Sequence, residues 1–250
     1  MSTVEQPRRI LVIGGTGGIG AALLAAAAQR WPDAERLATH RPERPPGTGA
    51  EHWFPLDLED PAAIDRCAAA VTAIGALDLV LIASGWLHDD QHKPEKSLRH
   101  LSADAFARAF AVNSSGPLLL LKALDQALTR SRTAVADSPA RCRVLVLSAK
   151  VGSISDNSLG GWHAYRMAKA ALNMGVRNLG LEYARNVRKP IIAAVHPGTT
   201  ESALSAPFST RGLPVVEAEV TARRLLDLAI ELTPEHQGGF FHWDGTALPY

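Results

Sequence analysis

The sequence predicts an α/β fold in which a doubly wound parallel β-sheet carries helices on both faces. Short apolar runs alternate with longer Ala- and Leu-rich segments along the 250 residues, and a glycine-rich turn directly follows the first run. Most of these runs are apolar throughout, as expected for strands that are covered on both faces. Neither an internal repeat nor a shift in composition divides the sequence. We therefore expect a single domain over residues 1–250.

The expected strands and helices alternate in chain order. The strands are expected at 9–14, 36–39, 52–56, 77–83, 143–148 and 191–196, and the third is weaker because it contains a proline. The helices are expected at 18–30, 60–74, 102–129, 161–187 and 217–232. Asp60-Pro61 and Ser102 are expected helix starts, because Asp and Ser side chains cap free N–H groups and proline suits the first helical position.

Charge and composition exclude several classes of protein. The formal net charge is +1, so there is no basic footprint for a nucleic acid. No stretch reaches the roughly 18 apolar residues of a membrane span, and the first apolar run is too short for a signal peptide. We therefore expect a cytoplasmic location. Cys67 and Cys142 are interpreted as buried reduced thiols, and the histidines lack metal-ligand spacing, so no metal is expected.

Five glycines occupy the turn after the first strand. In such a strand–turn–helix arrangement, glycines let the backbone approach a pyrophosphate, which the N-terminus of the helix stabilises. Three glycine patterns fit the sequence at this level: Gly15/Gly17/Gly20, Gly14/Gly17/Gly20 and Gly14/Gly18/Gly20. The turn therefore predicts a dinucleotide site of Rossmann type, with the register of its glycines open.

The end of the second expected strand indicates which dinucleotide binds. A site for NAD offers an acidic side chain to the ribose 2′-hydroxyl about twenty residues after the glycines. Here that position has Arg41, whose guanidinium can bind a 2′-phosphate through two parallel hydrogen bonds. This favours NADP(H) over NAD(H), although the nearby Glu43 keeps NAD(H) as an alternative.

Tyr165 and Lys169 are four residues apart within an expected helix, so they share one of its faces. A nearby ammonium group favours the phenolate and lowers the pKa of a tyrosine. Such a pair can protonate a developing alkoxide or deprotonate an alcohol. Tyr165 and Lys169 are therefore candidate catalytic residues.

Together these motifs resemble the classical short-chain dehydrogenase/reductase family over essentially the full length of the chain. The resemblance rests on a set of ordered motifs: Gly14-x-x-x-Gly18-Ile19-Gly20, Asp57, Asn113, Tyr165-x-x-x-Lys169 and Pro197-Gly198. It selects the Gly14/Gly18/Gly20 pattern. It also implies a hydride transfer between NADP(H) and a carbonyl/alcohol pair, with Tyr165 as general acid and base.

The resemblance also implies roles for individual residues. Asp57 would contact the adenine, and Asn113 would help to hold a water that relays protons to Lys169. Lys169 would also bind the nicotinamide ribose. The remaining positions that the resemblance assigns to the cofactor are Thr16, Gly17, Leu58, Gly85, Pro197, Gly198, Thr199 and Thr200.

A narrower resemblance is to the C-factor/sniffer-like branch of carbonyl reductases. It rests on the segments Gly152-Ser-Ile-Ser-Asp-Asn157, Gly160-Gly-Trp162, Tyr165-Arg-x-x-Lys169-Ala-Ala-Leu-Asn173, His196-Pro-Gly-Thr199 and Trp243-Asp-Gly-Thr-x-x-Pro249. This branch implies a small-molecule carbonyl substrate.

Two positions depart from the family pattern. The family usually has Asn-Ala-Gly after the fourth strand, where this chain has Ala83-Ser84-Gly85. The asparagine side chain that would brace the neighbouring strand is therefore missing, and we expect a cost in stability. The family's catalytic serine falls on Ala149, and the available hydroxyls are those of Ser148 and Ser153. Ser148 is the first choice and Ser153 the alternative. Without such a donor to the oxyanion, activity would be weak.

The segment at about 200–215 is expected to form a small lid over the substrate. Its apolar residues, together with two tryptophans, favour an apolar or aromatic carbonyl compound: Leu204, Phe208, Leu213, Trp86 and Trp162. In the family, the helices equivalent to 102–129 and 161–187 pair subunits, which implies a homodimer or homotetramer. A regulatory, cofactor-binding homologue without catalysis and an epimerase or dehydratase remain as alternative functions.

Overall fold

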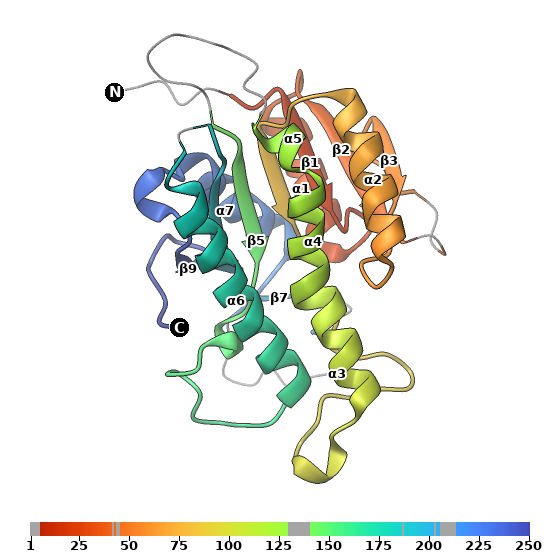
Figure 1. Ribbon diagram of the computed structural model, residues 1–250, viewed down its shortest axis with the longest axis vertical. Coiled ribbons are helices and arrows are strands. Elements are labelled where there is room, and N and C mark those ends of the chain that lie inside the picture. The colour runs from red at the N-terminus through yellow and green to blue at the C-terminus, as the bar shows by residue number, and fades with distance from the viewer. Residues whose placement is uncertain are drawn as a thin grey trace.

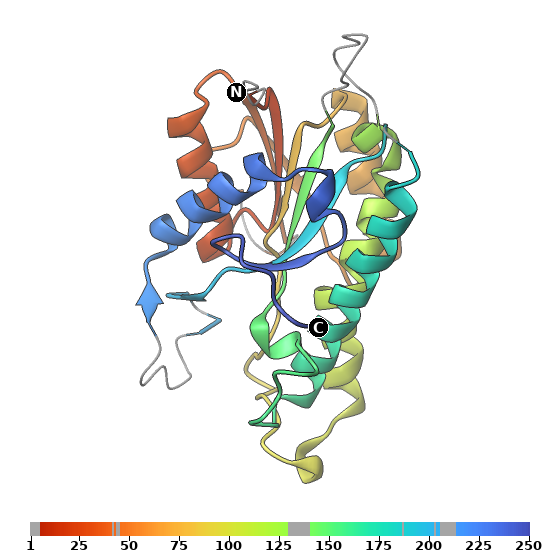
Figure 2. The same ribbon diagram turned by 90° about the vertical axis from the view of Figure 1, so that its left-hand side faces the viewer.

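The computed structural model describes residues 6–41, 43, 46–129, 141–186, 188–202, 204–205 and 214–250. A seven-stranded parallel sheet in the order β3-β2-β1-β4-β5-β6-β9 forms the middle layer of three (Figures 1 and 2). The predicted fold class is therefore confirmed. Its strands are β1 (Arg9–Ile13), β2 (Glu35–His40), β3 (His52–Pro55), β4 (Leu79–Ile82), β5 (Arg143–Leu147), β6 (Ile191–His196) and β9 (Phe240–His242).

The sheet changes direction between β1 and β4. From β1 the chain builds outward through β2 to β3, then returns to place β4 on the other side of β1. The C-terminal ends of β1 and β4 are therefore followed by loops that turn to opposite faces. In open α/β sheets, ligands bind at this switch point.

Helices cover both faces of the sheet. Figure 2 shows α1 (Gly18–Arg30) and α7 (Ala218–Glu231) on one face, and α2 (Pro61–Ile74), α4 (Gly116–Ala123) and α6 (His163–Tyr183) on the other. Strand β1 supplies both cores, because successive side chains point to opposite faces. Leu11 and Ile13 pack beneath α2, α4 and α6, whereas Ile10 and Val12 pack beneath α1 and α7.

The expected helix over 102–129 was wrong in one respect, because the structure divides it into pieces. Helix α3 (Ala103–Phe110) is followed by a π-turn (Ala111–Ser115), α4 and α5 (Asp125–Thr129). Pro117 has no N–H, so it cannot bond to the carbonyl of Asn113 four residues earlier. Gly116 N instead reaches back to the Ala111 carbonyl. The proline therefore explains a wider turn at Asn113, of a kind that is frequent at functional sites.

Both predicted helix starts are confirmed: Asp60 accepts from Ala62 N at 2.9 Å, and Ser102 accepts from Ala105 N at 3.3 Å.

Strand β9 was missed because it is a three-residue edge strand. The short β7 (Thr199–Thr200) and β8 (Val215–Val216) form a separate small sheet at the two ends of the predicted lid. Phe208 and Leu213 lie outside the described residues. Three 3₁₀ turns complete the secondary structure: Leu98–His100, Lys150–Gly152 and Pro234–His236.

Cys67 and Cys142 are buried and free, as predicted. Within the described ranges, no helix is both long and apolar enough to cross a membrane. The same residues contain no group of His, Cys, Asp or Glu side chains arranged to hold a metal ion.

Candidate functional site

A cavity of about 600 Å³ opens at the C-terminal ends of β1, β4 and β5. It lies at the switch point of the sheet, where this fold class binds ligands. Most of the residues expected at the site line it: Gly14, Thr16, Gly17, Gly18, Ile19, Arg41, Asp57, Leu58, Gly85, Ser148, Tyr165, Lys169 and Pro197. The lining does not include six other predicted residues: Gly20, Asn113, Ser153, Gly198, Thr199 and Thr200.

The glycine turn is shaped by close backbone contacts. Gly14 has a φ of +83°, and a Cβ there would lie 3.1 Å from the backbone nitrogen of Ser84. A Cβ on Gly20 would lie 2.1 Å from the Gly14 carbonyl oxygen. Gly20 therefore allows the turn to close against the start of α1. A Cβ on Gly18 would lie 3.6 Å from the Ser202 Cβ, which is an ordinary van der Waals contact.

The N-terminus of α1 is open toward the cavity. Its N-cap residue is Gly17, which has no side chain to cap the helix, and the first turn holds no acidic residue. The loop is anchored instead to β2, because Gly14 N donates to Thr39 Oγ1 at 2.9 Å. Free N–H groups at a helix start attract an anion such as a phosphate.

Arg41 and Glu43 both lie on the cavity wall just after β2. Nδ1 of the His40 ring lies 2.9 Å from the Arg41 carbonyl. Asp57, at the end of the next strand, accepts from Glu59 N at 2.9 Å. These residues define the end of the cavity farthest from Tyr165 in the sheet order, since β2 and β3 form one edge of the sheet.

Tyr165 and Lys169 lie in the first two turns of α6 and face the same cavity. The Lys169 side chain is buried, its Nζ donates to the Leu147 carbonyl at 2.9 Å, and this nitrogen lies 5.8 Å from the centre of the Tyr165 ring. The prediction that these two side chains lie close together is confirmed, because a spacing of four residues places them on one helix face.

The protonation of the pair differs from the sequence expectation. Burial lowers the pKa of Lys169 to about 7, and burial raises the pKa of Tyr165 above the ordinary tyrosine value. Desolvation therefore outweighs the ammonium, which was expected to lower the tyrosine pKa. At neutral pH, Tyr165 therefore retains its proton.

Asn113 is fully buried in the π-turn, and both polar atoms of its side chain are hydrogen-bonded to the Trp86 backbone. Its Oδ1 accepts from Trp86 N at 2.9 Å, and its Nδ2 donates to the Trp86 carbonyl at 2.8 Å. The amide thus fixes the start of the loop after β4. The main-chain carbonyl of Asn113 lacks the ordinary helical donor, because Pro117 has no N–H.

The two candidate serines differ in position. Ser148 lines the cavity, and its hydroxyl donates to Asn173 Oδ1 at 2.6 Å. Ser153 is also buried, and its hydroxyl accepts from Asp156 N at 3.2 Å within the following loop. Ser84 follows Ala83, which stands at the position of the family's asparagine, and its buried hydroxyl has no hydrogen-bond partner among the residues that the structure describes. It therefore does not replace the missing brace.

The last predicted segment of the site begins after β6. Gly198 has a φ of +82°, which suits the turn that follows Pro197. Thr200 is buried and its hydroxyl lies 2.9 Å from that of Thr221 on α7, so this side chain joins β7 to α7. Further along, the Leu204 carbonyl lies 3.2 Å from Nε2 of His88, which connects the lid segment to the loop after β4.

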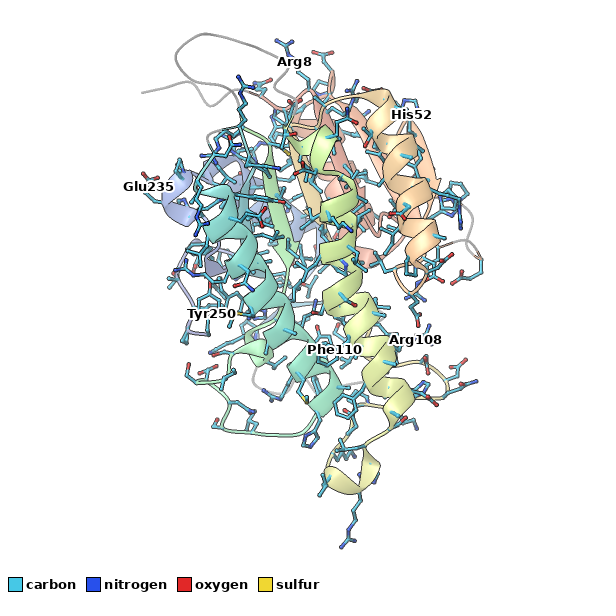
Figure 3. The ribbon with its side chains drawn as sticks, viewed as in Figure 1. Arg8, His52, Arg108, Phe110, Glu235 and Tyr250 are labelled. Carbon is cyan, nitrogen blue, oxygen red and sulfur yellow. The ribbon has the colours of Figure 1, made fainter. Side chains whose placement is uncertain are left out.

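Sequence reasoning missed a charged cluster on the cavity rim. Arg108 of α3 forms ion pairs with Asp89 at 2.7 Å and with Glu59 at 3.2 Å, and its guanidinium lies over the Trp86 ring (Figure 3 labels Arg108). Burial raises the pKa of Asp89, but backbone N–H groups of His92 and Gln91 outweigh it and bring that pKa to about 2. No local motif marks these residues, because they meet only through the tertiary fold.

Comparisons with known proteins agree with this geometry. The family model described as enoyl-(acyl carrier protein) reductase matches residues 20–229. C-signal of Myxococcus xanthus is 33% identical over 144 residues, or 58% of this chain and 78% of that protein. The 1-hydroxy-2-glutathionyl-2-methyl-3-butene dehydrogenase of Rhodococcus sp. is 28% identical over 198 residues, or 78% of each chain.

Two solved structures share the fold. The carbonyl reductase Sniffer of D. melanogaster superposes with a TM-score of 0.84 at 21% identity, covering 98% of this chain and 100% of that one. The NADPH-bound carbonyl reductase from chicken fatty liver superposes with a TM-score of 0.83 at 23% identity, with the same coverage. The match over 20–229, the sheet order and the glycine turn together establish that this chain belongs to the short-chain dehydrogenase/reductase family of oxidoreductases.

Proposed function

We propose that the protein is an NADP(H)-dependent oxidoreductase that interconverts a carbonyl compound and an alcohol, with Tyr165 as general acid and base. One observation carries the proposal: a single cavity joins the open N-terminus of α1 to the Tyr165–Lys169 pair. The first feature suits a dinucleotide and the second suits proton transfer to a carbonyl oxygen.

The residues present fit a nicotinamide dinucleotide. Gly14, Gly17 and Gly18 line the cavity without side chains, and the uncapped N–H groups at the start of α1 suit the pyrophosphate. Asp57 and Leu58 would border the adenine. Pro197 would border the nicotinamide, backed by Gly198, Thr199 and Thr200. When bound, the cofactor supplies or accepts the hydride.

Arg41 supports NADP(H) as the preferred cofactor. Its guanidinium can form paired hydrogen bonds with the 2′-phosphate, whereas a carboxylate at this position would repel that group. The structural relative from chicken fatty liver has NADPH bound. Glu43 lies on the same wall, so the preference depends on which of the two side chains faces the ribose.

Tyr165 is proposed to complete the reduction of the carbonyl. As the carbonyl carbon takes up the hydride, the Tyr165 hydroxyl gives its proton to the carbonyl oxygen, and a hydroxyl group results. In the reverse direction, the phenolate takes the proton from the alcohol. The raised pKa of Tyr165 keeps the phenol protonated at neutral pH, which favours the direction of reduction.

Lys169 and Asn113 are proposed to return a proton to Tyr165 after it has given its own to the substrate. One of the three Nζ protons of Lys169 is bound to the Leu147 carbonyl, which leaves two donors for a ribose hydroxyl and a water. The main-chain carbonyl of Asn113 would hold that water. Ser148 is the cavity-lining candidate for a hydrogen bond to the substrate oxygen, provided that its hydroxyl turns away from Asn173.

An apolar or aromatic carbonyl compound is the proposed substrate class. Trp86, Val112 and Leu204 line the cavity, and Trp86 is almost fully buried there. Apolar walls with a few polar groups are typical of sites for small organic ligands.

A homodimer or homotetramer is proposed as the assembly. Apolar side chains are exposed on the outer surfaces of α4 and α6: Leu119, Met167, Met174 and Leu181. A second copy that covers this surface would remove them from water. Light scattering with Met174→Glu tests this, and a wild-type protein that is monomeric at micromolar concentration would contradict it.

The deciding experiment follows NADPH and NADH oxidation with a panel of aromatic aldehydes, ketones and diones. Tyr165→Phe is expected to lose at least a hundredfold in turnover while cofactor affinity changes little. Arg41→Ala should weaken the binding of NADPH but not that of NADH. Arg8→Ala is the matched control, because Arg8 is exposed, directly precedes β1 and does not line the cavity. Turnover that survives in Tyr165→Phe would refute the proposed mechanism.

A cofactor-binding regulatory protein is the second candidate. Ala149 occupies the family's serine position, and the relative from Myxococcus xanthus is named C-signal. This candidate predicts measurable NADPH binding without oxidation of NADPH by any carbonyl compound.

A further inference from the structure

Glu95 is a buried carboxylate within an otherwise solvent-facing stretch. It lies in the loop between β4 and α3 and is only 3% exposed, whereas its neighbours Lys96 and Ser97 are exposed. Burial of a carboxylate is costly unless hydrogen bonds compensate for the lost water. The position of Glu95 therefore calls for partners, and the structure shows them at the start of α6.

Two groups of Glu95 contact the first turn of α6. Its carboxylate oxygens lie 3.4 and 3.3 Å from Ala164 N, which donates to them, and its main-chain carbonyl accepts from Trp162 N at 2.6 Å. In Figure 1 the loop after β4 lies beside the beginning of α6, although 69 residues separate Glu95 from Ala164.

Helix α6 needs this support because it lacks a cap of its own. Its N-cap residue is Trp162, whose side chain makes no capping bond, and its first turn holds no acidic residue. In contrast, α2 and α3 are capped by Asp60 and Ser102. A carboxylate at a helix N-terminus is favourable because it pairs with free N–H groups and with the helix dipole.

The same contacts hold a strained residue. Trp162 has φ +49° and ψ +44°, and among the residues the structure describes it is the one non-glycine residue with a positive φ. Bulky residues rarely adopt this conformation, and strain of this kind persists only where the surroundings enforce it. The Trp162 ring then lies edge-on to the Tyr165 ring, with 6.4 Å between ring centres and an interplanar angle of 73°.

We propose that Glu95 is a positioning residue for Tyr165, acting through the first turn of α6 and the ring of Trp162. The inference rests on the proposed function of Tyr165 for its effect on turnover. Glu95 does not touch the reacting atoms. Its role is to hold the phenol at the angle and depth that proton transfer needs, because a displacement of about 1 Å can cost about a hundredfold in rate.

The test compares Glu95→Ala, which removes the acceptor, with Glu95→Gln, which retains an oxygen for Ala164 N. Asp104→Ala is the matched control. Like Glu95→Ala, it removes a carboxylate near the start of a helix, but Asp104 is exposed and lies in the first turn of α3. The chain has three tyrosines, so tyrosine labelled with ¹³C at Cζ gives three NMR signals for Tyr165, Tyr183 and Tyr250.

In Glu95→Ala the Tyr165 signal should shift or broaden while those of Tyr183 and Tyr250 remain in place. With NADPH and 4-nitrobenzaldehyde as the probe, kcat should fall about ten- to a hundredfold while the Kd of NADPH changes less than about twofold. Glu95→Gln should recover the greater part of kcat, and Asp104→Ala should leave the Tyr165 signal in place.

An unchanged Tyr165 signal in Glu95→Ala would overturn the proposal, as would equal changes in all three tyrosine signals. An unchanged kcat in an active enzyme would also overturn it. If the wild-type protein itself reduces no carbonyl compound, the proposed function fails, but the Tyr165 signal still decides whether Glu95 positions this side chain.

Discussion

The two ends of the cavity are built by different means. At the dinucleotide end, the glycine turn offers mainly backbone N–H groups, and the start of α1 is left uncapped. At the catalytic end, the start of α6 is occupied by Glu95, Trp162 is strained and Lys169 is buried. One helix start is free to bind an anion and the other is filled. Under the proposed function, the start of α1 would bind the pyrophosphate and the start of α6 would serve proton transfer.

The difference has an energetic side. Among the described residues at the dinucleotide end, Arg41 and Asp57 are half-buried and Glu43 is exposed, so no charged side chain there is fully buried. The energetic cost of this end lies in the close packing of its backbone. The catalytic end buries an amine whose charged form is disfavoured, as the lowered pKa of Lys169 shows. A substitution at the catalytic end should therefore lower activity while it raises the free energy of unfolding. A substitution at the dinucleotide end should lower both.

The largest effect is expected from Lys169→Met, which removes the buried amine but preserves much of its volume. Turnover should fall by about a hundred- to ten-thousandfold, because Tyr165 loses its proton supply. The free energy of unfolding at pH 7 should nevertheless rise by about 1–3 kcal/mol, because the desolvation penalty exceeds the lost hydrogen bond to Leu147. Steady-state kinetics and urea unfolding measure the two effects. A variant that is both inactive and less stable would contradict this opposition.

At the dinucleotide end, Gly20→Ala and Gly18→Ala form a matched pair. The Gly20→Ala methyl group would clash with the Gly14 carbonyl oxygen, so stability should fall by about 1–3 kcal/mol and NADPH affinity should fall with it. The Gly18→Ala methyl group has room against Ser202, so stability should be unchanged or slightly higher. Thermal unfolding without cofactor and NADPH titration check both. Equal losses of stability would show that the turn is more plastic than the structure indicates.

In the wild-type protein, activity and the free energy of unfolding should also change in opposite directions as the pH rises. Lys169 has its pKa lowered from 10.5 to about 7, so it loses its charge as the pH rises through about 7. Carbonyl reduction should then decline by up to about tenfold per pH unit. Between about pH 7 and 10.5 the unfolded chain binds one more proton at this residue than the folded chain does. The contribution of Lys169 to the free energy of unfolding therefore rises with pH in that window.

The comparison of wild type with Lys169→Met isolates this contribution. The difference in unfolding free energy between the two proteins should shrink as the pH rises from 7, by up to about 1.4 kcal/mol per pH unit. A constant difference across pH 7–9 would mean that Lys169 titrates outside this range.

The smallest effects are expected from the serines. Ser148→Ala should lower turnover about tenfold or less and cost about 1–2 kcal/mol of stability, because Asn173 Oδ1 loses a buried donor. Ser153→Ala should leave turnover unchanged, because this side chain lies outside the lining of the cavity. A larger kinetic effect in Ser153→Ala would reverse the assignment of the two serines.

The sequence by itself determined the features that depend on short spacing. The α/β order, the glycine turn, the helix caps at Asp60 and Ser102 and the Tyr165–Lys169 pair follow from local pattern, since neighbours along a helix or turn are neighbours in space. Even the break near Asn113 has a local cause in Pro117, although the sequence argument passed over it. The sequence also showed that Ala149 stands at the position of the family's catalytic serine, and it ranked Ser148 ahead of Ser153 as the replacement.

The tertiary structure alone decided the features that depend on distant partners and on burial. Asn113 binds Trp86, Glu95 binds Ala164 and Arg108 joins Glu59 to Asp89, each across separations with no fixed pattern. The lowered pKa that the sequence predicted for Tyr165 was wrong for the same reason, because burial raises that pKa. The sequence shows that an ammonium stands beside a phenol, but only the fold determines how much water each group loses, and desolvation sets the sign of both pKa shifts.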